Sequence, residues 1–282
     1  MATLQIVHTI ALLRSRLAAA RREGARIGLV PTMGALHDGH LSLVRETRKV
    51  ADKIVVSIFV NPAQFGPHED FDRYPRTLDA DSDKLAAAGG TNLIFAPSVA
   101  EMYPEGFATR IEVGGPSQGL ETDFRPHFFF GVATVVAKLM LAAMPDVATF
   151  GQKDYQQLLV VRRLAADLGL ATEILGAPIV READGLAMSS RNAYLSPGER
   201  KIAGQLNVIL KQTVVSLRNG TAIAVGEVEG RRALLAAGFD SVDYLAVRGA
   251  ATLAPIDSLD SPARVLTAAK VGSTRLIDNM AV

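Results

Sequence analysis

The sequence predicts an α/β protein: a Rossmann-like, doubly wound parallel sheet followed by a smaller C-terminal α+β domain. Apolar runs rich in Ile and Val alternate with segments of helical periodicity through the first two thirds of the chain. The runs are continuously apolar, which is typical of parallel strands that helices cover on both faces. After about residue 180 the segments become shorter and more mixed. We therefore expect two domains, residues 1–179 and residues 180–282.

The first domain is expected to alternate helices and strands. Thr9 caps a first helix that ends at Gly24 and turns Leu12, Leu13 and Leu17 inward. The alternative for this arginine-rich start, which holds no acid before Glu23, is a mitochondrial transit peptide. The expected strands are 27–30, 54–60, 93–96, 147–150 and 172–175, and the later helices are 41–50, 78–88, 132–143 and 155–168.

The second domain opens with a strong helix start. Ser196 is an N-cap residue, Pro197 takes the first helical position and Glu199 the third, which completes a capping box. A second helix is expected over 225–237, followed by strands over 242–247, 264–271 and 274–278.

Composition excludes several classes of function. Thirty Lys and Arg against 29 Asp and Glu give a net charge of +1, so the overall field favours neither nucleic acid nor an anionic membrane. Without cysteine there is no disulfide, no thiolate metal site and no Cys nucleophile. The longest apolar stretch, 128–137, is shorter than the ~20 residues that span a bilayer. We expect a cytoplasmic protein with neither a nucleic-acid nor a membrane partner.

The most informative segment, residues 31–40, reads Pro-Thr-Met-Gly-Ala-Leu-His-Asp-Gly-His between a strand and a helix. Ligands bind beyond the carboxyl ends of parallel strands, and a helix N-terminus attracts phosphate. His37 and His40 can both donate hydrogen bonds to phosphate oxygens as charge develops. The structural alternative is a pair of surface histidines that cap the helix. A weaker alternative is a zinc site with a third ligand from a carboxylate or from His8, His68 or His127.

Two further segments offer phosphate-binding groups. Lys153, within residues 150–157, can place a positive charge at a second strand end, with Gln157 one helical turn further along. Residues 189–191, Ser-Ser-Arg, offer two hydroxyls and a guanidinium at the expected domain junction. A solvated turn with an ordinary surface lysine and a serine-rich turn are the alternatives.

A fourth segment, Asn-Pro-Ala-Gln-Phe at residues 61–65, ends the second strand beside the histidine loop. A strand-terminal turn explains Asn61 and Pro62 better than it explains Gln64. An amide next to the apolar face of the helix at 132–143 predicts a pocket for a ligand that is part hydrocarbon and part hydroxyl or carboxylate.

Together with residues 74–77 and 180–192, these segments resemble the pantothenate synthetase family of AMP-forming pantoate–β-alanine ligases, in order and over nearly the whole chain. Residues 37–40 are similar to the His-x-Gly-His signature of the class I synthetase and nucleotidylyltransferase superfamily. Residues 188–191 stand where the mobile second signature of that superfamily would be. The resemblance implies that pantoate attacks ATP to give pantoyl adenylate and pyrophosphate, and that β-alanine then displaces AMP. The alternatives are a nucleotidylyltransferase acting on another small acid or phosphate, and a catalytically silent nucleotide-binding regulator.

The resemblance also implies roles for the matching residues. The catalytic groups would be His37, which is also the family's proposed proton donor, His40, Lys153, Ser189 and Arg191. ATP would be bound by Met33, Gly34, His37, Gly39, His40, Gly151, Lys153, Asp154, Val180, Met188, Ser189, Ser190 and Arg191. Pantoate would be bound by Gln64, Gln157, Val135, Val136 and Leu139. Magnesium would bridge the ATP phosphates with Asp81 nearest to it, the C-terminal domain would close over ATP, and the chain would form a homodimer.

The chain departs from the family pattern at two places. The family reads Arg-Pro-x-His-Phe-x-Gly, whereas residues 125–131 here read Arg-Pro-His-Phe-Phe-Phe-Gly. If Gly131 fixes the register, Phe128 takes the place of the histidine. Ala80 stands where some relatives carry a second acid beside Asp81, which weakens the expectation of a carboxylate pair for magnesium.

Overall fold

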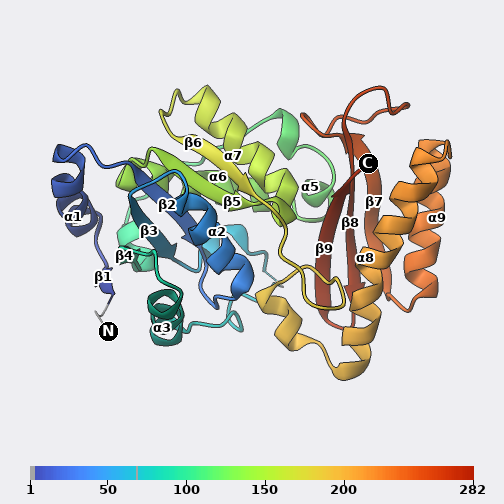
Figure 1. Ribbon diagram of the computed structural model, residues 1–282, viewed down its shortest axis with the longest axis horizontal. Helices are drawn as coiled ribbons and strands as arrows, with labels where there is room; N and C mark the ends of the chain where they lie inside the picture. The colour runs from blue at the N-terminus through green and yellow to red at the C-terminus, as the bar shows by residue number, and fades with distance from the viewer. Residues whose placement is uncertain (1–3, 68) are drawn as a thin grey trace.

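The computed structural model describes residues 4–67 and 69–282, and within them it shows two sheets (Figure 1). The first sheet has six strands in the order β1-β4-β3-β2-β5-β6, and all its pairings are parallel. Its strands are β1 (Gln5–Val7), β2 (Ile27–Thr32), β3 (Lys53–Ile58), β4 (Leu93–Phe95), β5 (Val147–Gly151) and β6 (Glu173–Ala177). The predicted doubly wound parallel sheet is confirmed.

The strand order reverses between β2 and β5. From β2 the chain adds β3 and then β4 on one side, whereas β5 and β6 extend the sheet on the other side. At such a reversal the loops after the two central strands turn away from each other and leave a crevice beyond their carboxyl ends. The histidine loop follows β2 and the Lys153 segment follows β5, so the topology brings both to this crevice.

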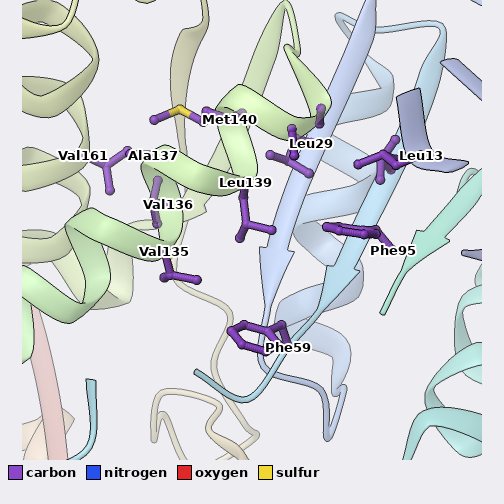
Figure 2. Packing of buried hydrophobic residues seen from close by; sticks show 14 of the residues in the cluster. Leu13, Leu29, Phe59, Phe95, Val135, Val136, Ala137, Leu139, Met140 and Val161 are labelled. Carbon is purple, nitrogen blue, oxygen red and sulfur yellow. The ribbon is translucent and has the colours of Figure 1, made fainter. Parts of the chain in front are cut away.

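Helices cover both faces of the first sheet. One face packs against α1 (Ile10–Arg22), α6 (Phe128–Ala143) and α7 (Tyr155–Asp167), and the other against α2 (Asp38–Arg48) and α3 (Leu78–Ala88). Consecutive strand residues pack on opposite faces of the sheet. Leu29 packs with residues of α1, α6 and α7, and Val30 packs with residues of α2 and α3. Figure 2 shows side chains of α6 gathered beside Leu29 of β2.

The second sheet is antiparallel, with the order β7-β8-β9. Its strands are β7 (Ser241–Gly249), β8 (Ala263–Val271) and β9 (Thr274–Ala281). Helices α8 (Pro197–Arg218), which begins with the predicted capping box, and α9 (Ile223–Ala236) cover one face. The other face packs on Leu120 and on Leu159 of α7. The smaller C-terminal α+β region is therefore confirmed.

Three details differ from the sequence-based expectation. The edge strand β1 was not expected, because three residues are too few to show a pattern. Leu12 is 39% exposed and not inward-facing, whereas Leu13 on the same helix is fully buried. Helix α6 begins at Phe128, one turn earlier than residue 132.

The remaining helical segments are short: η1 (Pro62–Gln64), α4 (Val99–Met102), η2 (Gly115–Ser117), α5 (Glu121–Phe124), η3 (Gln152–Asp154) and η4 (Ser190–Tyr194). In the described residues, every helix is too short or too polar to cross a membrane.

Candidate active site

A cavity of about 680 Å³ lies at the carboxyl ends of β2 and β5 and extends to the second sheet. Its volume lies within the range of small-molecule sites. It is lined by most of the residues that the sequence singled out: Met33, His37, Gly39, His40, Gln64, Val135, Val136, Leu139, Gly151, Lys153, Asp154, Gln157, Val180, Met188, Ser189, Ser190 and Arg191. Gly34 and Asp81 are not among the lining residues.

The two histidines cap helix α2 with one ring nitrogen each. Nδ1 of His37, the N-cap residue, accepts a hydrogen bond from the Gly39 N–H at 3.1 Å. Nδ1 of His40 accepts one from the His37 N–H at 3.3 Å. Because Nδ1 is the acceptor in both rings, each neutral imidazole carries its proton on Nε2. Both histidines therefore cap α2, but they are partly buried and not surface residues, and capping leaves two Nε2–H donors on rings that line the cavity.

The surroundings keep both histidines neutral. Burial lowers the pKa of His37 to about 4, helped by the nearby charge of Lys153. Burial lowers the pKa of His40 to about 3, helped by His37, whose ring centroid lies 4.1 Å away. At pH 7 the rings therefore act as neutral hydrogen-bond donors, and the positive charge of the site comes from lysine and arginine.

These pKa values predict how stability depends on pH. Between about pH 6.5 and pH 3 the unfolded chain binds more protons at His37 and His40 than the folded chain does. Their neutral form therefore stabilises the fold fully above about pH 6.5, and this stabilisation is lost as the pH falls towards 3. We expect the loss of unfolding free energy between about pH 7 and pH 5 to be smaller in His40→Asn than in the parent. Urea denaturation at both pH values measures this, and equal losses would contradict the neutral assignment.

Asp81 anchors the histidine loop from behind and does not face the cavity. Its fully buried carboxylate accepts hydrogen bonds from the N–H groups of Ala35 at 2.9 Å and Leu36 at 2.8 Å, and from the Thr77 hydroxyl at 3.1 Å. Gly34, at φ +84°, makes the turn beside it, where a Cβ would lie 3.1 Å from Asp81 Oδ2. Asp81 and Gly34 thus support the loop, and their expected contacts with magnesium and ATP stay predictions.

Within the part of the chain that the structure describes, the alternative zinc site receives no third ligand. His8 lies at the end of β1 with Nδ1 bonded to the Ala96 carbonyl, and His127 lies beside Glu69. His68 lies outside the described residues. Among residues 4–67 and 69–282, no group of three or more His, Asp and Glu side chains could hold a metal ion.

A buried hydrogen-bond cluster positions Gln64 at the end of β3. Asn61, which is 1% exposed, caps η1, and its Nδ2 donates to Gln64 Oε1 at 3.0 Å and to the Gly131 carbonyl at 3.2 Å. Gln64 Nε2 lies 3.2 Å from the sulfur of Met33. The apolar wall opposite is formed by Val135, Val136 and Leu139, which belong to the core as well as to the cavity. Asn61 therefore has a positioning role that a turn alone does not explain.

Lys153 lies in the short turn η3, between β5 and α7. It lines the cavity, and its charge contributes to the lowered pKa values of both His37 and His40. The lysine predicted from the second segment is therefore part of the same site as the histidines.

The Ser-Ser-Arg segment is held by a loop that sequence reasoning did not connect to it. Arg191 binds both carboxylate oxygens of Asp70, with Nε and Nη2 at 2.9 and 2.8 Å. The Ser190 hydroxyl lies 3.1 Å from the hydroxyl of Tyr74. Asp70 occupies two of the five N–H groups of the guanidinium, so the others can still bind a ligand. Tyr74 belongs to residues 74–77, which contribute to the family resemblance. The sequence around Asp70 contains no motif that would predict its pairing with Arg191.

The start of α6 places Phe128 at the cavity, and that Phe128 replaces the family's histidine stays a prediction, which depends on the register at Gly131. Phe128 lines the cavity, and the Arg125 guanidinium stacks on its ring at 3.9 Å from the centroid. His127 is the N-cap residue of α6, and its Nε2 lies 3.6 Å from a carboxylate oxygen of Glu69. The imidazole thus lies against Gly66 and Glu69, and the ring of Phe128 faces the cavity.

Comparison with known proteins agrees with this geometry. A sequence model of the family described as pantoate-beta-alanine ligase matches residues 5–281. This chain belongs to the pantoate-beta-alanine ligase family. A pantothenate synthetase from Mesorhizobium japonicum is 57% identical to this ligase over 278 residues, which cover 99% of this chain and 98% of the relative. A relative from Rhodopseudomonas palustris, also named pantothenate synthetase, is 56% identical, with 98% of both chains covered.

Solved structures extend the likeness to the fold. A pantothenate synthetase from Thermus thermophilus superposes on this ligase with a TM-score of 0.92 at 50% identity, and 98% of this chain and 99% of that chain are covered. A pantoate-beta-alanine ligase from Francisella tularensis superposes with a TM-score of 0.83 at 32% identity, covering 98% and 97%. That protein was solved in complex with beta-gamma ATP and beta-alanine.

In this ligase a buried ion-pair network beside the cavity joins α5 to the second sheet, and sequence reasoning missed it. Glu121, which is 5% exposed, binds both Nη atoms of Arg275 at 2.8 Å and accepts from the Tyr244 hydroxyl at 2.7 Å. Burial alone would raise the pKa of Glu121, but Arg275 outweighs burial and the pKa is lowered. The partners are more than 120 residues apart along the chain, so no local pattern could have connected them.

Proposed function

We propose that the cavity binds ATP and pantoate side by side and that the ligase joins pantoate to β-alanine through pantoyl adenylate. The observation that carries this proposal is that two kinds of polar group line one cavity. The histidines, Lys153 and the Ser-Ser-Arg segment suit a triphosphate, and Gln64 with Gln157 suits the hydroxyl and carboxylate groups of a small acid. The Francisella complex with beta-gamma ATP and beta-alanine supports the assignment of nucleotide and amine.

In the first step, a carboxylate oxygen of pantoate attacks the α-phosphorus of ATP. A new P–O bond forms, the bond from the α-phosphorus to the bridging oxygen breaks, and pyrophosphate leaves. Negative charge grows on the phosphate oxygens, where the Nε2–H groups of His37 and His40 and the ammonium of Lys153 can stabilise it. Because the pKa of His37 is about 4, we assign it hydrogen-bond donation at pH 7 and not the proton transfer that the resemblance implies.

In the second step, the amine of β-alanine attacks the acyl carbon of the adenylate. The C–N bond forms, the C–O bond to AMP breaks, and the nitrogen releases one proton. Water would compete with the amine for the adenylate. The apolar wall of Val135, Val136 and Leu139, together with Phe128, limits the access of water to this part of the cavity.

We propose that Mg²⁺ enters with ATP and is bound by phosphate oxygens and water. Most acidic side chains that line the cavity already pair with arginine, as Asp70 does with Arg191 and Asp278 with Arg181. Mg²⁺ on nucleotide phosphates commonly keeps several water ligands and few protein ligands. When bound, it would neutralise part of the charge of the triphosphate.

Four further expectations are part of the proposal. The domain boundary at 179/180 is supported by the end of β6 at Ala177 and by the hairpin around the Arg181–Ala187 bridge, which leads into the Ser-Ser-Arg segment. We propose that this C-terminal part closes over ATP, that the ligase is a homodimer, and that it acts in the cytoplasm. Light scattering of the purified ligase tests the homodimer, and a monomeric mass would contradict it.

Gly131 lets α6 approach η1 closely enough to build the proposed pantoate site. A Cβ on Gly131 would lie 2.2 Å from the Ala63 carbonyl oxygen and 2.7 Å from Gln64 Cα. Backbone atoms cannot yield as a flexible side chain does, so Gly131→Ala must push η1 and Gln64 away from α6. We expect an unfolding free energy lower by about 1–3 kcal/mol and a raised KM for pantoate. Denaturant unfolding and steady-state kinetics measure both effects, and a parent-like KM for pantoate would contradict this role.

Isotope exchange of pyrophosphate into ATP tests the proposed function. Adenylation is reversible and precedes the amine, so exchange should require pantoate and proceed without β-alanine. A stable nucleotidyl product that does not react with β-alanine would favour the nucleotidylyltransferase alternative. ATP binding without any exchange would favour the silent regulator.

A further inference from the structure

We propose that Asn279, on strand β9 of the second sheet, is a positioning residue for adenylation, because it holds the turn that carries Lys153. This inference rests on the proposed role of Lys153 at the phosphates. Asn279 and Lys153 are 126 residues apart in the chain. Figure 1 shows β9 as the strand of the second sheet nearest to the first sheet.

The contact is made by one amide group on two consecutive carbonyls. Nδ2 of Asn279 donates to the carbonyl of Gln152 at 2.9 Å and to the carbonyl of Lys153 at 2.8 Å. Its Oδ1 accepts a hydrogen bond from the guanidinium of Arg264. The side chain is 2% exposed, so all three contacts are made away from bulk water. Each amide hydrogen therefore has a partner, and the arginine fixes which way the amide points.

The turn depends on an outside donor because its backbone is not continuous with the helix that follows. Asp154, the last residue of η3, has φ −90° and ψ 60°, outside the helical region. This conformation interrupts the regular hydrogen-bond ladder at the residue after Lys153. A buried carbonyl without a donor costs free energy, so the turn keeps this shape best while Asn279 supplies two donors.

Asn279 is itself fixed from both sides. It pairs with Leu266 in the register of β8 and β9, and its N–H donates to Asp278 Oδ1 at 2.7 Å. Asp278, whose side chain is fully buried, binds Arg181 with both oxygens at 2.6 and 2.9 Å. Arg181 belongs to the hairpin that leads into the Ser-Ser-Arg segment. Two adjacent residues of β9 thus contact both segments: Asn279 binds backbone carbonyls of η3, and Asp278 binds the guanidinium of Arg181.

The hydrogen bonds from Asn279 affect where the ammonium of Lys153 can lie. Lys153 has a long, flexible side chain, so the position of its ammonium depends on where its backbone is held. A misplacement of about 1 Å in a catalytic group can reduce the rate about a hundredfold. Asn279 lines the cavity, but both hydrogens of its amide are engaged by the carbonyls of Gln152 and Lys153, so in this proposal it acts through Lys153.

A double-mutant cycle tests the inference. The single-turnover rate of adenylation, without β-alanine, is compared in the parent, Asn279→Ala, Lys153→Ala and the double variant. We expect Asn279→Ala to slow adenylation by about ten- to a hundredfold in the parent, and by less than about threefold when Lys153 is already alanine. Non-additivity of this kind distinguishes positioning from a general loss of stability.

Thr213→Val is the matched control. Thr213 is a buried residue of α8, and its hydroxyl donates to the Ile209 carbonyl at 3.0 Å within the helix. The variant removes a buried hydrogen bond of the C-terminal region without touching the cavity. We expect a lowered melting temperature with a parent-like adenylation rate. If Thr213→Val slows adenylation as much as Asn279→Ala does at an equal loss of melting temperature, the inference is overturned.

The remaining outcomes separate this inference from the proposed function. If Lys153→Ala adenylates slowly, and Asn279→Ala lowers the adenylation rate by the same factor in the parent and in Lys153→Ala, the positioning role is wrong and the proposed function stands. If Lys153→Ala adenylates at the parent rate, both fall. If Asn279→Ala does not fold, Asn279→Asp replaces it, because a carboxylate keeps the volume but cannot donate to the two carbonyls. A parent-like rate in Asn279→Asp also overturns the inference.

Discussion

Replacing Lys153 by alanine is expected to slow adenylation by about 10²–10³-fold, or about 3–4 kcal/mol in the barrier. The ammonium is the charge that the turn after β5 brings to the cavity, while both neighbouring histidines are neutral at pH 7. Its loss removes a charge-assisted contact where negative charge develops, in a site partly shielded from water. Rapid-quench measurement of pantoyl adenylate in a single turnover gives the rate directly.

Two variants control for the Lys153 experiment. Lys211→Ala removes an exposed lysine of α8 and should leave the rate unchanged. Lys153→Arg keeps the charge but alters the reach and shape of the group, so we expect a rate between those of the parent and Lys153→Ala. Adenylation by Lys153→Ala at the parent rate would contradict the role of the ammonium.

A second large loss of the adenylation rate is expected when either histidine is replaced by alanine. His40→Ala should slow adenylation by about 10²–10³-fold, because it removes one Nε2–H donor together with the Nδ1 acceptor that helps to cap α2. His37→Ala removes the corresponding pair of functions and should cost a similar factor. The single-turnover assay measures both variants, and far-UV circular dichroism checks that the fold is retained.

Replacing His40 by glutamine tests whether the site needs a neutral hydrogen-bond donor or a positively charged imidazole at this position. Gln can place a neutral N–H near the position of Nε2, so His40→Gln should keep more activity than His40→Ala. Because both histidines of the free ligase have pKa values of about 4 or below, neither should give an inflection in kcat/KM for ATP between about pH 6 and pH 8. A rate that rises as an imidazole protonates near pH 6.5 would show that the charged form acts.

The sequence predicts the fold because strands and helix starts depend on residues that are close together in the chain. The apolar runs at 27–30 and 147–150 became the central strands β2 and β5, and their ends carry the histidine and lysine segments. The rule that ligands bind beyond strand ends then places His37, His40 and Lys153 together before any contact is known. The capping box at Ser196 is equally local, since its two halves are three residues apart.

What the sequence does not predict depends on long-range contacts. Asp81 is a well-placed acid by sequence, yet its burial behind the loop turns it into an acceptor for two backbone N–H groups. The pairing of Arg191 with Asp70 spans 121 residues and has no pattern at either end. Asn279 lies in an ordinary strand, and the docking of β9 beside η3 gives the hydrogens of its amide their partners. Long-range contacts therefore set the positions of the site residues, although local sequence motifs already indicate the chemistry of these residues.

A crystal structure of the ligase with a non-hydrolysable ATP analogue and pantoate tests the central claim most directly. The predicted result places the triphosphate within hydrogen-bond distance of Nε2 of His37 and His40 and of Nζ of Lys153, with the pantoate carboxylate between Gln64 and the α-phosphate. A triphosphate bound elsewhere, or an Nε2 that faces away from it in both histidines, would contradict the claim.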